Sequence, residues 1–171
     1  AQRTALLPGL ADGSLKLAFA SLEPGRRYSL APATTVAKPS AGGWQLDGAK
    51  SVVIGAPGAA RLIVSARTAG AADDAAGVSL FIVAPATPGV SLSPSRTVDG
   101  QRCADVAFKA VQLPADALLG PAGGALDLID EATDFATALL CADAIGAMKS
   151  ANDDTLEYIK TRKQFGAPIG S

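Results

Sequence analysis

The sequence contains no histidine, and it has only two cysteines among its 171 residues. Without imidazole groups the chain cannot form Ser/His or Cys/His nucleophile pairs, and zinc or non-haem iron bound by histidine is not expected. We therefore predict no metal site. Cys103 and Cys141 lack the Cys-x-x-Cys spacing, and the first residues do not have the pattern of a secretory signal, so both thiols are expected to be free.

An excess of one charge sign is also absent, and so is any long apolar run. Lys and Arg number 15 against 16 Asp and Glu, so the net charge is −1 and no basic field would attract nucleic acid or anionic lipid. No window reaches the roughly 20 apolar residues that span a bilayer. These absences predict a cytoplasmic protein with no nucleic-acid partner and no membrane insertion. The first residue is not methionine, which suggests a fragment.

Short apolar runs separated by Gly- and Pro-rich turns occupy most of the chain. Apolar residues make up 49% of the sequence, which is enough for a sizeable core. Runs of this kind are typical of short strands. Strands are predicted over residues 15–21, 33–38, 43–46, 49–54, 62–67, 78–83, 90–93 and 104–111. They predict an antiparallel β-barrel or sandwich, preceded by a helix over residues 2–7 that ends at Pro8 and Gly9.

The sharpest local signal in the strand region is Asp47-Gly48. Such a pair between two apolar runs predicts a two-residue type I′ turn. In that register Leu46 lies opposite Ala49, and Trp44 lies opposite Ser51. We interpret Trp44 as a packing residue of the barrel rather than a cofactor-stacking one.

The pattern changes near residue 121, where helix-forming residues begin to dominate. One helix of about 40 residues, about 60 Å long, is predicted to end near residue 164. Acidic residues near its start and basic residues near its end complement the helix dipole. Residues 135–148 are apolar on almost every side, so other helices must cover them. The predicted fold class is therefore α+β multidomain, with a long helix from an incomplete bundle completed by a continuation of the chain, another subunit, or both.

Two groups of charged residues have open interpretations. The carboxylates on one side of the predicted helix either form a solvated face or include a ligand contact at Asp134, beside the apolar segment. Arg26 and Arg27 follow the turn at Pro24 and Gly25. They either grip phosphates in bidentate fashion or lie solvated on the surface.

Seven short motifs occur in one order along the chain, at residues 7–13, 18–25, 43–50, 62–67, 77–90, 106–120 and 158–169. The last contains Tyr158 followed by Arg162-x-Gln-Phe-Gly. Each motif alone is weak, but together they resemble the acyl-CoA dehydrogenase family. Residues 29–30, 50–53 and 120–121 are most similar to the small subunit of pimeloyl-CoA dehydrogenase.

The resemblance implies a three-domain enzyme. Residues 1–14 would end an N-terminal helical domain, residues 15–120 would form the middle β-barrel, and residues 121–171 would give the first long helix of a C-terminal four-helix bundle. Such enzymes bind FAD, remove the α and β hydrogens of an acyl-CoA, and pass electrons to an electron-accepting flavoprotein. They form homo- or hetero-oligomers, dimers or tetramers, through the C-terminal helices. The catalytic base would lie beyond Ser171, so no catalytic residue is predicted here.

The resemblance also assigns site residues position by position. The predicted cofactor-binding residues of the barrel are Phe19, Ser21, Leu22, Tyr28, Val52, Val53 and Ile54. Arg162, Gln164 and Phe165 would reach the FAD of a neighbouring subunit. Arg27, Tyr28 and Asp134 are the predicted substrate contacts.

Several of these positions depart from the family pattern. Leu22 stands where the family usually has a hydroxyl residue, and residues 52–54 replace its Trp-x-Thr. Thr137 replaces an arginine that contacts substrate. An alternative is therefore a non-catalytic structural subunit with degraded flavin contacts. A stand-alone β-barrel binding module is a third interpretation, and the uncovered helix counts against it.

Overall fold

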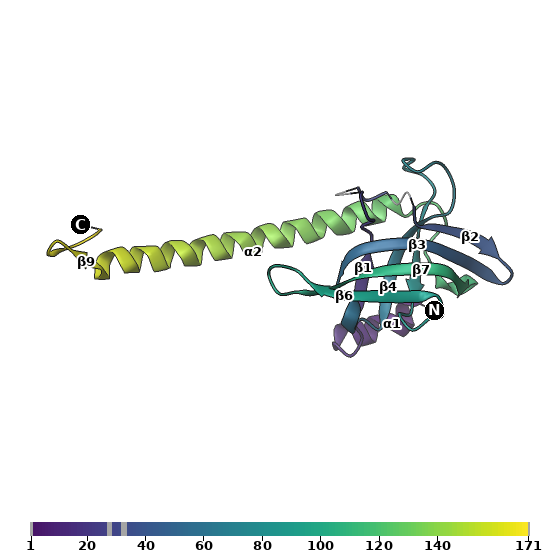
Figure 1. Ribbon diagram of the computed structural model, residues 1–171, viewed down its shortest axis with the longest axis horizontal. Coiled ribbons are helices and arrows are strands. Elements are labelled where there is room, and N and C mark those ends of the chain that lie inside the picture. Colours follow the sequence, from purple (N-terminus) through teal and green to yellow (C-terminus); the bar gives the residue numbers. More distant parts are fainter. Residues whose placement is uncertain (1, 27–28, 32–33, 171) are drawn as a thin grey trace. The chain divides into compact units, whose positions relative to one another are not determined.

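The computed structural model describes residues 2–26, 29–31 and 34–170 of the chain (Figure 1). Its helices are α1 (Gln2–Ala11) and α2 (Leu126–Thr161), and its strands are β1 (Leu17–Ala20), β2 (Val36–Ser40), β3 (Gly43–Ile54), β4 (Arg61–Arg67), β5 (Val78–Val83), β6 (Val90–Arg96), β7 (Arg102–Pro114), β8 (Leu118–Leu119), β9 (Lys163–Gln164) and β10 (Ala167–Pro168). The chain divides into two compact units, Ala1–Ile129 and Asp130–Ser171. The three-domain assignment with limits at residues 14 and 120 stays a prediction.

The first unit is built on one eight-stranded sheet. Its strands follow the order β6-β7-β3-β2-β4-β5-β8, and β1 pairs with β4 beside this path. Most neighbours are antiparallel, but β1 and β4 are parallel over four residue pairs, and Val36 pairs with Arg67 in parallel. The predicted β-rich domain followed by a long helix is confirmed. The sheet is mixed rather than purely antiparallel, and among the described residues its two end strands do not pair to close it.

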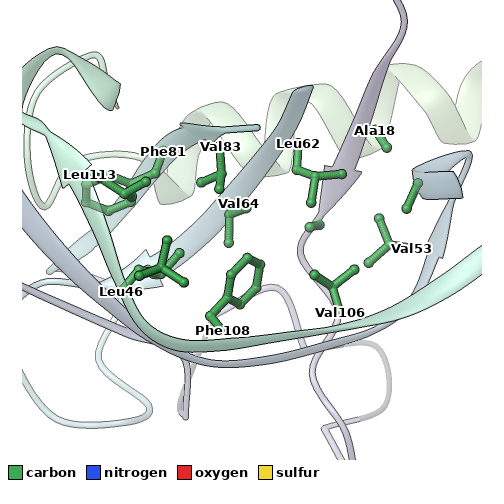
Figure 2. Packing of buried hydrophobic residues seen from close by; sticks show 14 of the residues in the cluster. Ala18, Leu46, Val53, Leu62, Val64, Phe81, Val83, Val106, Phe108 and Leu113 are labelled. Carbon is green, nitrogen blue, oxygen red and sulfur yellow. The ribbon is translucent and has the colours of Figure 1, made fainter. Parts of the chain in front are cut away.

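The inner side of the sheet holds one hydrophobic core (Figure 2). Leu62 and Val64 of β4 and Val106 and Phe108 of β7 are almost completely buried in it. Trp44 packs at its edge, as predicted. Its ring meets Phe81 of β5 edge to face, with ring centroids 5.4 Å apart.

The predicted turn at Asp47-Gly48 is wrong. β3 runs without interruption from Gly43 to Ile54, and the hairpin turn joins β2 to β3 at Ala41 and Gly42. Gly48 has a φ of 141°, and a Cβ built there would lie 2.5 Å from the Cα of Thr35. The glycine therefore permits a close approach of two backbones and does not mark a chain reversal.

The first helix also differs from the prediction. It continues through Pro8 to Ala11, and the N–H of Asp12 donates to the Pro8 carbonyl at 3.1 Å. A proline deprives only one carbonyl of its partner inside a helix. The exposed helix α1 tolerates that loss.

Helix α2 is anchored at its start and exposed along its length. Ala125 donates its N–H to the Val78 carbonyl of β5 at 2.9 Å, and Ile129 is buried in a second small cluster with Val78 and Leu80. Further along, apolar side chains such as Phe135 and Leu140 are more than 60% exposed. The described part of the second unit thus supplies no cover for this segment of α2.

Candidate functional site

A buried ion pair holds the loop that follows β1. The Lys50 ammonium of β3 lies 3.2 Å from a carboxylate oxygen of Glu23, and these side chains are 0% and 2% exposed. Lys50 also donates to the Ser21 carbonyl and the Ser65 hydroxyl, each at 3.1 Å. An ammonium group has three donors, so each finds a partner here. The start of the loop is thereby fixed to β3 and β4.

The Glu23 carboxylate reaches the far end of the same loop. It accepts hydrogen bonds from the N–H of Thr34 at 2.9 Å, the hydroxyl of Thr34 at 3.0 Å and the N–H of Thr35 at 2.8 Å. Burying two charges carries a desolvation penalty that complete hydrogen bonding offsets. Burial lowers the pKa of Lys50 to about 8, although the attraction of Glu23 opposes the shift. The pair therefore closes the loop at both ends.

Four of the predicted cofactor contacts are half-exposed apolar side chains beside this loop. They are Phe19 on β1, Leu22 in the loop, and Val52 and Ile54 on β3, and we call them the apolar face. Each is between 38% and 46% exposed. Ser51 donates its N–H to the Leu22 carbonyl at 2.9 Å, so the loop lies alongside the end of β3.

Two further predicted contacts belong to the interior. Ser21 is buried, and its carbonyl accepts a hydrogen bond from Lys50. Val53 is 2% exposed and points into the hydrophobic core (Figure 2). Their side chains therefore do not contribute to the apolar face.

The substrate-side predictions fall in different places. Arg27 and Tyr28 lie outside the described residues. Arg26 forms an ion pair with Asp73, from the loop between β4 and β5. Its Nε is buried without a hydrogen-bond partner in the described structure. Asp134 is exposed on α2, within the second unit.

The three remaining predicted contacts lie at the end of α2, in the second unit. β9 and β10 form a small hairpin, and Phe165 and Gly166 between them have φ values of 51° and 84°. The N–H of Ile169 donates to the Arg162 carbonyl at 3.0 Å. Phe165 is fully exposed, and Gln164 pairs with Ala167 across the hairpin. The hairpin thus presents an aromatic ring and a guanidinium at one end of a helix.

Other site types are not found in the described part of the chain. It holds no group of three or more His, Cys, Asp or Glu residues arranged to bind a metal ion. Cys103 and Cys141 are both free, as predicted. None of the described helices has the length and apolar character needed to cross a membrane.

The sequence analysis missed Lys50 as the anchor of the loop. One signal was available, because Leu46 and Lys50 stand at even spacing and so fall on one face of β3. A lysine on an otherwise apolar face indicates a buried partner. That partner lies 27 residues away, however, and only the strand topology brings it near.

The described residues form a mixed β-sheet unit followed by a long helix with exposed apolar side chains. The family model "Acyl-CoA dehydrogenase, middle domain" matches residues 18–111. The chain therefore belongs to the acyl-CoA dehydrogenase family.

Individual relatives agree with this assignment. The chain is 33% identical to acyl-CoA dehydrogenase FadE12 of Mycobacterium tuberculosis over 172 residues, covering 99% of this chain and 44% of that protein. It is 28% identical to the human mitochondrial short-chain specific acyl-CoA dehydrogenase, covering 98% of this chain and 41% of the relative. The chain thus spans less than half the length of these relatives.

Solved structures show the same fold. The FAD complex of PigA superposes with a TM-score of 0.92 at 27% identity, covering 98% of this chain and 44% of that one. A probable acyl-CoA dehydrogenase of Mycobacterium abscessus gives a TM-score of 0.90 at 22% identity, with coverages of 98% and 45%.

Removing the Lys50 ammonium should destabilise the fold. Lys50→Met leaves the buried Glu23 without its counter-ion, and we expect the free energy of unfolding to fall by about 3 kcal/mol. Urea denaturation followed by tryptophan fluorescence measures this loss. The control Lys109→Met replaces an exposed lysine of β7 and should change stability by no more than about 0.5 kcal/mol. Equal effects of the two variants would contradict the role of the pair.

The loss of stability caused by Lys50→Met should depend on pH. The pKa of Lys50 is about 8 in the folded chain, below the ordinary value of 10.5 that applies after unfolding. Between these values the unfolded chain keeps the proton and the folded chain has lost it, so rising pH favours the folded state. The destabilisation caused by Lys50→Met should therefore be larger at pH 10 than at pH 7. Denaturation of both proteins at the two pH values checks the sign, and a smaller difference at pH 10 would contradict it.

Proposed function

We propose that this chain is the flavin-facing part of an enzyme that binds FAD and dehydrogenates an acyl-CoA thioester between its α and β carbons. The observation that carries the proposal is the apolar face, held beside a loop that the Glu23–Lys50 pair fixes. Family membership adds the reaction class. Cofactor sites are mostly apolar with a few placed polar groups, and the flat ring system of a flavin suits such a surface.

The residues present fit FAD mainly through apolar contact. Phe19, Leu22, Val52 and Ile54 would pack against the ring system, and none of them brings a hydroxyl group. The ion pair holds the described ends of the loop, at residues 21–23 and 34–35, which limits the entropy that these segments lose on binding. Arg162, Gln164 and Phe165 would contact the FAD of a neighbouring subunit, because they lie on an exposed hairpin with no partner groups for the Phe165 ring in the described chain.

When bound, FAD supplies the hydride acceptor for the β carbon. The contribution of this chain is to orient the ring and to exclude water from the side that the apolar face covers. Asp134, Arg27 and Tyr28 would contact the acyl-CoA. The α-proton would be taken by a base outside this chain, and the electrons would leave to an electron-accepting flavoprotein. The exposed apolar side chains of α2 favour a homo- or hetero-oligomer, dimer or tetramer, assembled through helices of this kind.

A second candidate function rests on the missing hydroxyl groups. Leu22 and Ile54 cannot donate hydrogen bonds to a flavin, and Thr137 on α2 replaces an arginine. A structural subunit that keeps the fold and has lost the cofactor would show this pattern. The small subunit of a hetero-oligomer, of the pimeloyl-CoA dehydrogenase type, remains the matching prediction.

Flavin content separates the two candidates. We expect the full-length protein that contains this chain to show the flavin absorption bands after purification, alone or with a co-expressed partner subunit. Because binding is non-covalent in this proposal, acid precipitation should release the absorbance into the supernatant. The structural-subunit function predicts no flavin in either preparation.

Truncating Arg162 should weaken FAD retention. The exposed guanidinium would make charge-assisted hydrogen bonds to an anionic cofactor, and their loss should raise the FAD dissociation constant about ten-fold or more. Ultrafiltration of the full-length oligomer followed by flavin fluorescence of the filtrate measures the change. Lys163→Ala is the matched control, since it removes the adjacent exposed cation of the same hairpin. Unchanged retention in Arg162→Ala would contradict the cross-subunit assignment.

A further inference from the structure

The pair of strands β3 and β7 contains two irregularities of the same kind. Their register shifts between Leu46 and Gly48, and again between Lys50 and Val53. At the first shift Asp47 of β3 faces two residues of β7, Lys109 and Ala110. At the second, Asp105 of β7 faces two residues of β3, Ser51 and Val52. Two residues opposite one define a β-bulge.

Each bulge contains a residue in the left-handed region. Val52 has a φ of 50° and Ala110 a φ of 49°. Left-handed backbone is uncommon for residues other than glycine and is a genuine outlier for a β-branched side chain such as valine. Phe165 is the other non-glycine residue with positive φ in the described chain, so two of these three residues are predicted cofactor contacts. Backbone strain persists only where surrounding contacts impose it, and it collects at functional sites.

In both bulges the single facing residue is an aspartate that caps the left-handed amide. Val52 donates its N–H to Asp105 Oδ1 at 2.9 Å, and Ala110 donates its N–H to Asp47 Oδ1 at 2.7 Å. A bulge removes such an amide from the sheet ladder, and the carboxylate supplies the missing acceptor. Each left-handed residue thus has its amide satisfied by an aspartate of the facing strand.

The bulge at Val52 reverses which side chains face outward. Leu46 and Lys50 of β3 point inward, at even spacing. Without an extra residue, that spacing would turn Val52 and Ile54 into the core and expose Val53. The structure shows the opposite, with Val53 buried and the other two about 45% exposed. The bulge thus lets one strand keep Lys50 inside and still present two residues of the apolar face.

We propose that Asp105 is a positioning residue for the cofactor surface, because its cap on the Val52 amide keeps the bulge that turns Val52 and Ile54 outward. This inference rests on the proposed function for the identity of the ligand. Asp105 itself is exposed on β7, and its described contact with β3 is through the Val52 amide. It therefore acts on the cofactor surface through the backbone of β3.

FAD affinity of the full-length protein tests the proposal. Asp105→Ala should raise the FAD dissociation constant about ten-fold or more, since it removes a charge-assisted hydrogen bond that shapes the surface. Asp105→Asn keeps an acceptor oxygen at the same place and should restore most of the affinity. Asp47→Ala removes the same cap from the bulge at Ala110, so it should lower the melting temperature comparably while leaving FAD affinity unchanged. Equal losses of affinity in Asp105→Ala and Asp47→Ala would overturn the proposal.

A thiol-labelling experiment measures which side chains of β3 are accessible to solvent, and it needs no bound cofactor. In a protein with Cys141 replaced by serine, Ile54→Cys should react rapidly with a thiol reagent, and Val53→Cys should react slowly. Adding Asp105→Ala should reduce or reverse this contrast, and an unchanged contrast would overturn the positioning role. Absence of FAD from the unsubstituted protein would instead overturn the proposed function, while the labelling result would still decide what Asp105 does to β3.

Discussion

The Glu23–Lys50 ion pair is the interaction on which the candidate site depends. It joins four parts of the first unit: the end of β1, the start of β2, the middle of β3 and the middle of β4. Removing both charges from water is unfavourable, and the surrounding hydroxyl, carbonyl and amide groups offset the penalty. The pair holds the described ends of this loop, at residues 21–23 and 34–35, and Leu22 lies against β3 through the hydrogen bond from the Ser51 N–H to its carbonyl.

The ion pair and the bulges together explain how one sheet carries both a buried core and the exposed apolar face. Lys50 must point inward to meet Glu23, while its neighbours Val52 and Ile54 must point outward to form the apolar face. Strict alternation along β3 forbids this combination. The extra residue at the bulge allows it, with Asp105 accepting the hydrogen bond of the displaced amide. The inward-pointing Lys50 and the outward-pointing Val52 and Ile54 therefore lie within only five residues of β3.

The departures from the family pattern change the kind of contact that the apolar face can make with a ligand. The apolar face lacks side-chain hydroxyl groups, so the proposed flavin contact relies on shape, apolar area and a backbone fixed beforehand. Hydrogen bonds from side chains add specificity, but a rigid apolar surface lowers the entropy lost on binding. The exposed apolar residues of α2 and the exposed ring of Phe165 favour further contacts from other helices or subunits. The alternative of a structural subunit remains physically distinct, because it needs those contacts and no cofactor.

The amino-acid sequence by itself determined the β-rich class, the long helix and most strand positions, because alternation and period are local properties of the chain. The family came from the resemblance of seven short motifs in one order along the chain. The motif with Glu23 and Pro24 was likewise visible. The sequence pattern predicted the wrong hairpin at Asp47-Gly48. A glycine needed for close backbone packing against Thr35 has the same local signature as a turn glycine. Only the tertiary structure decided that Lys50 pairs with Glu23 and that Asp105 caps Val52. Both contacts join residues far apart in the chain, and strand register, which brings them together, is set by the pairing of whole strands.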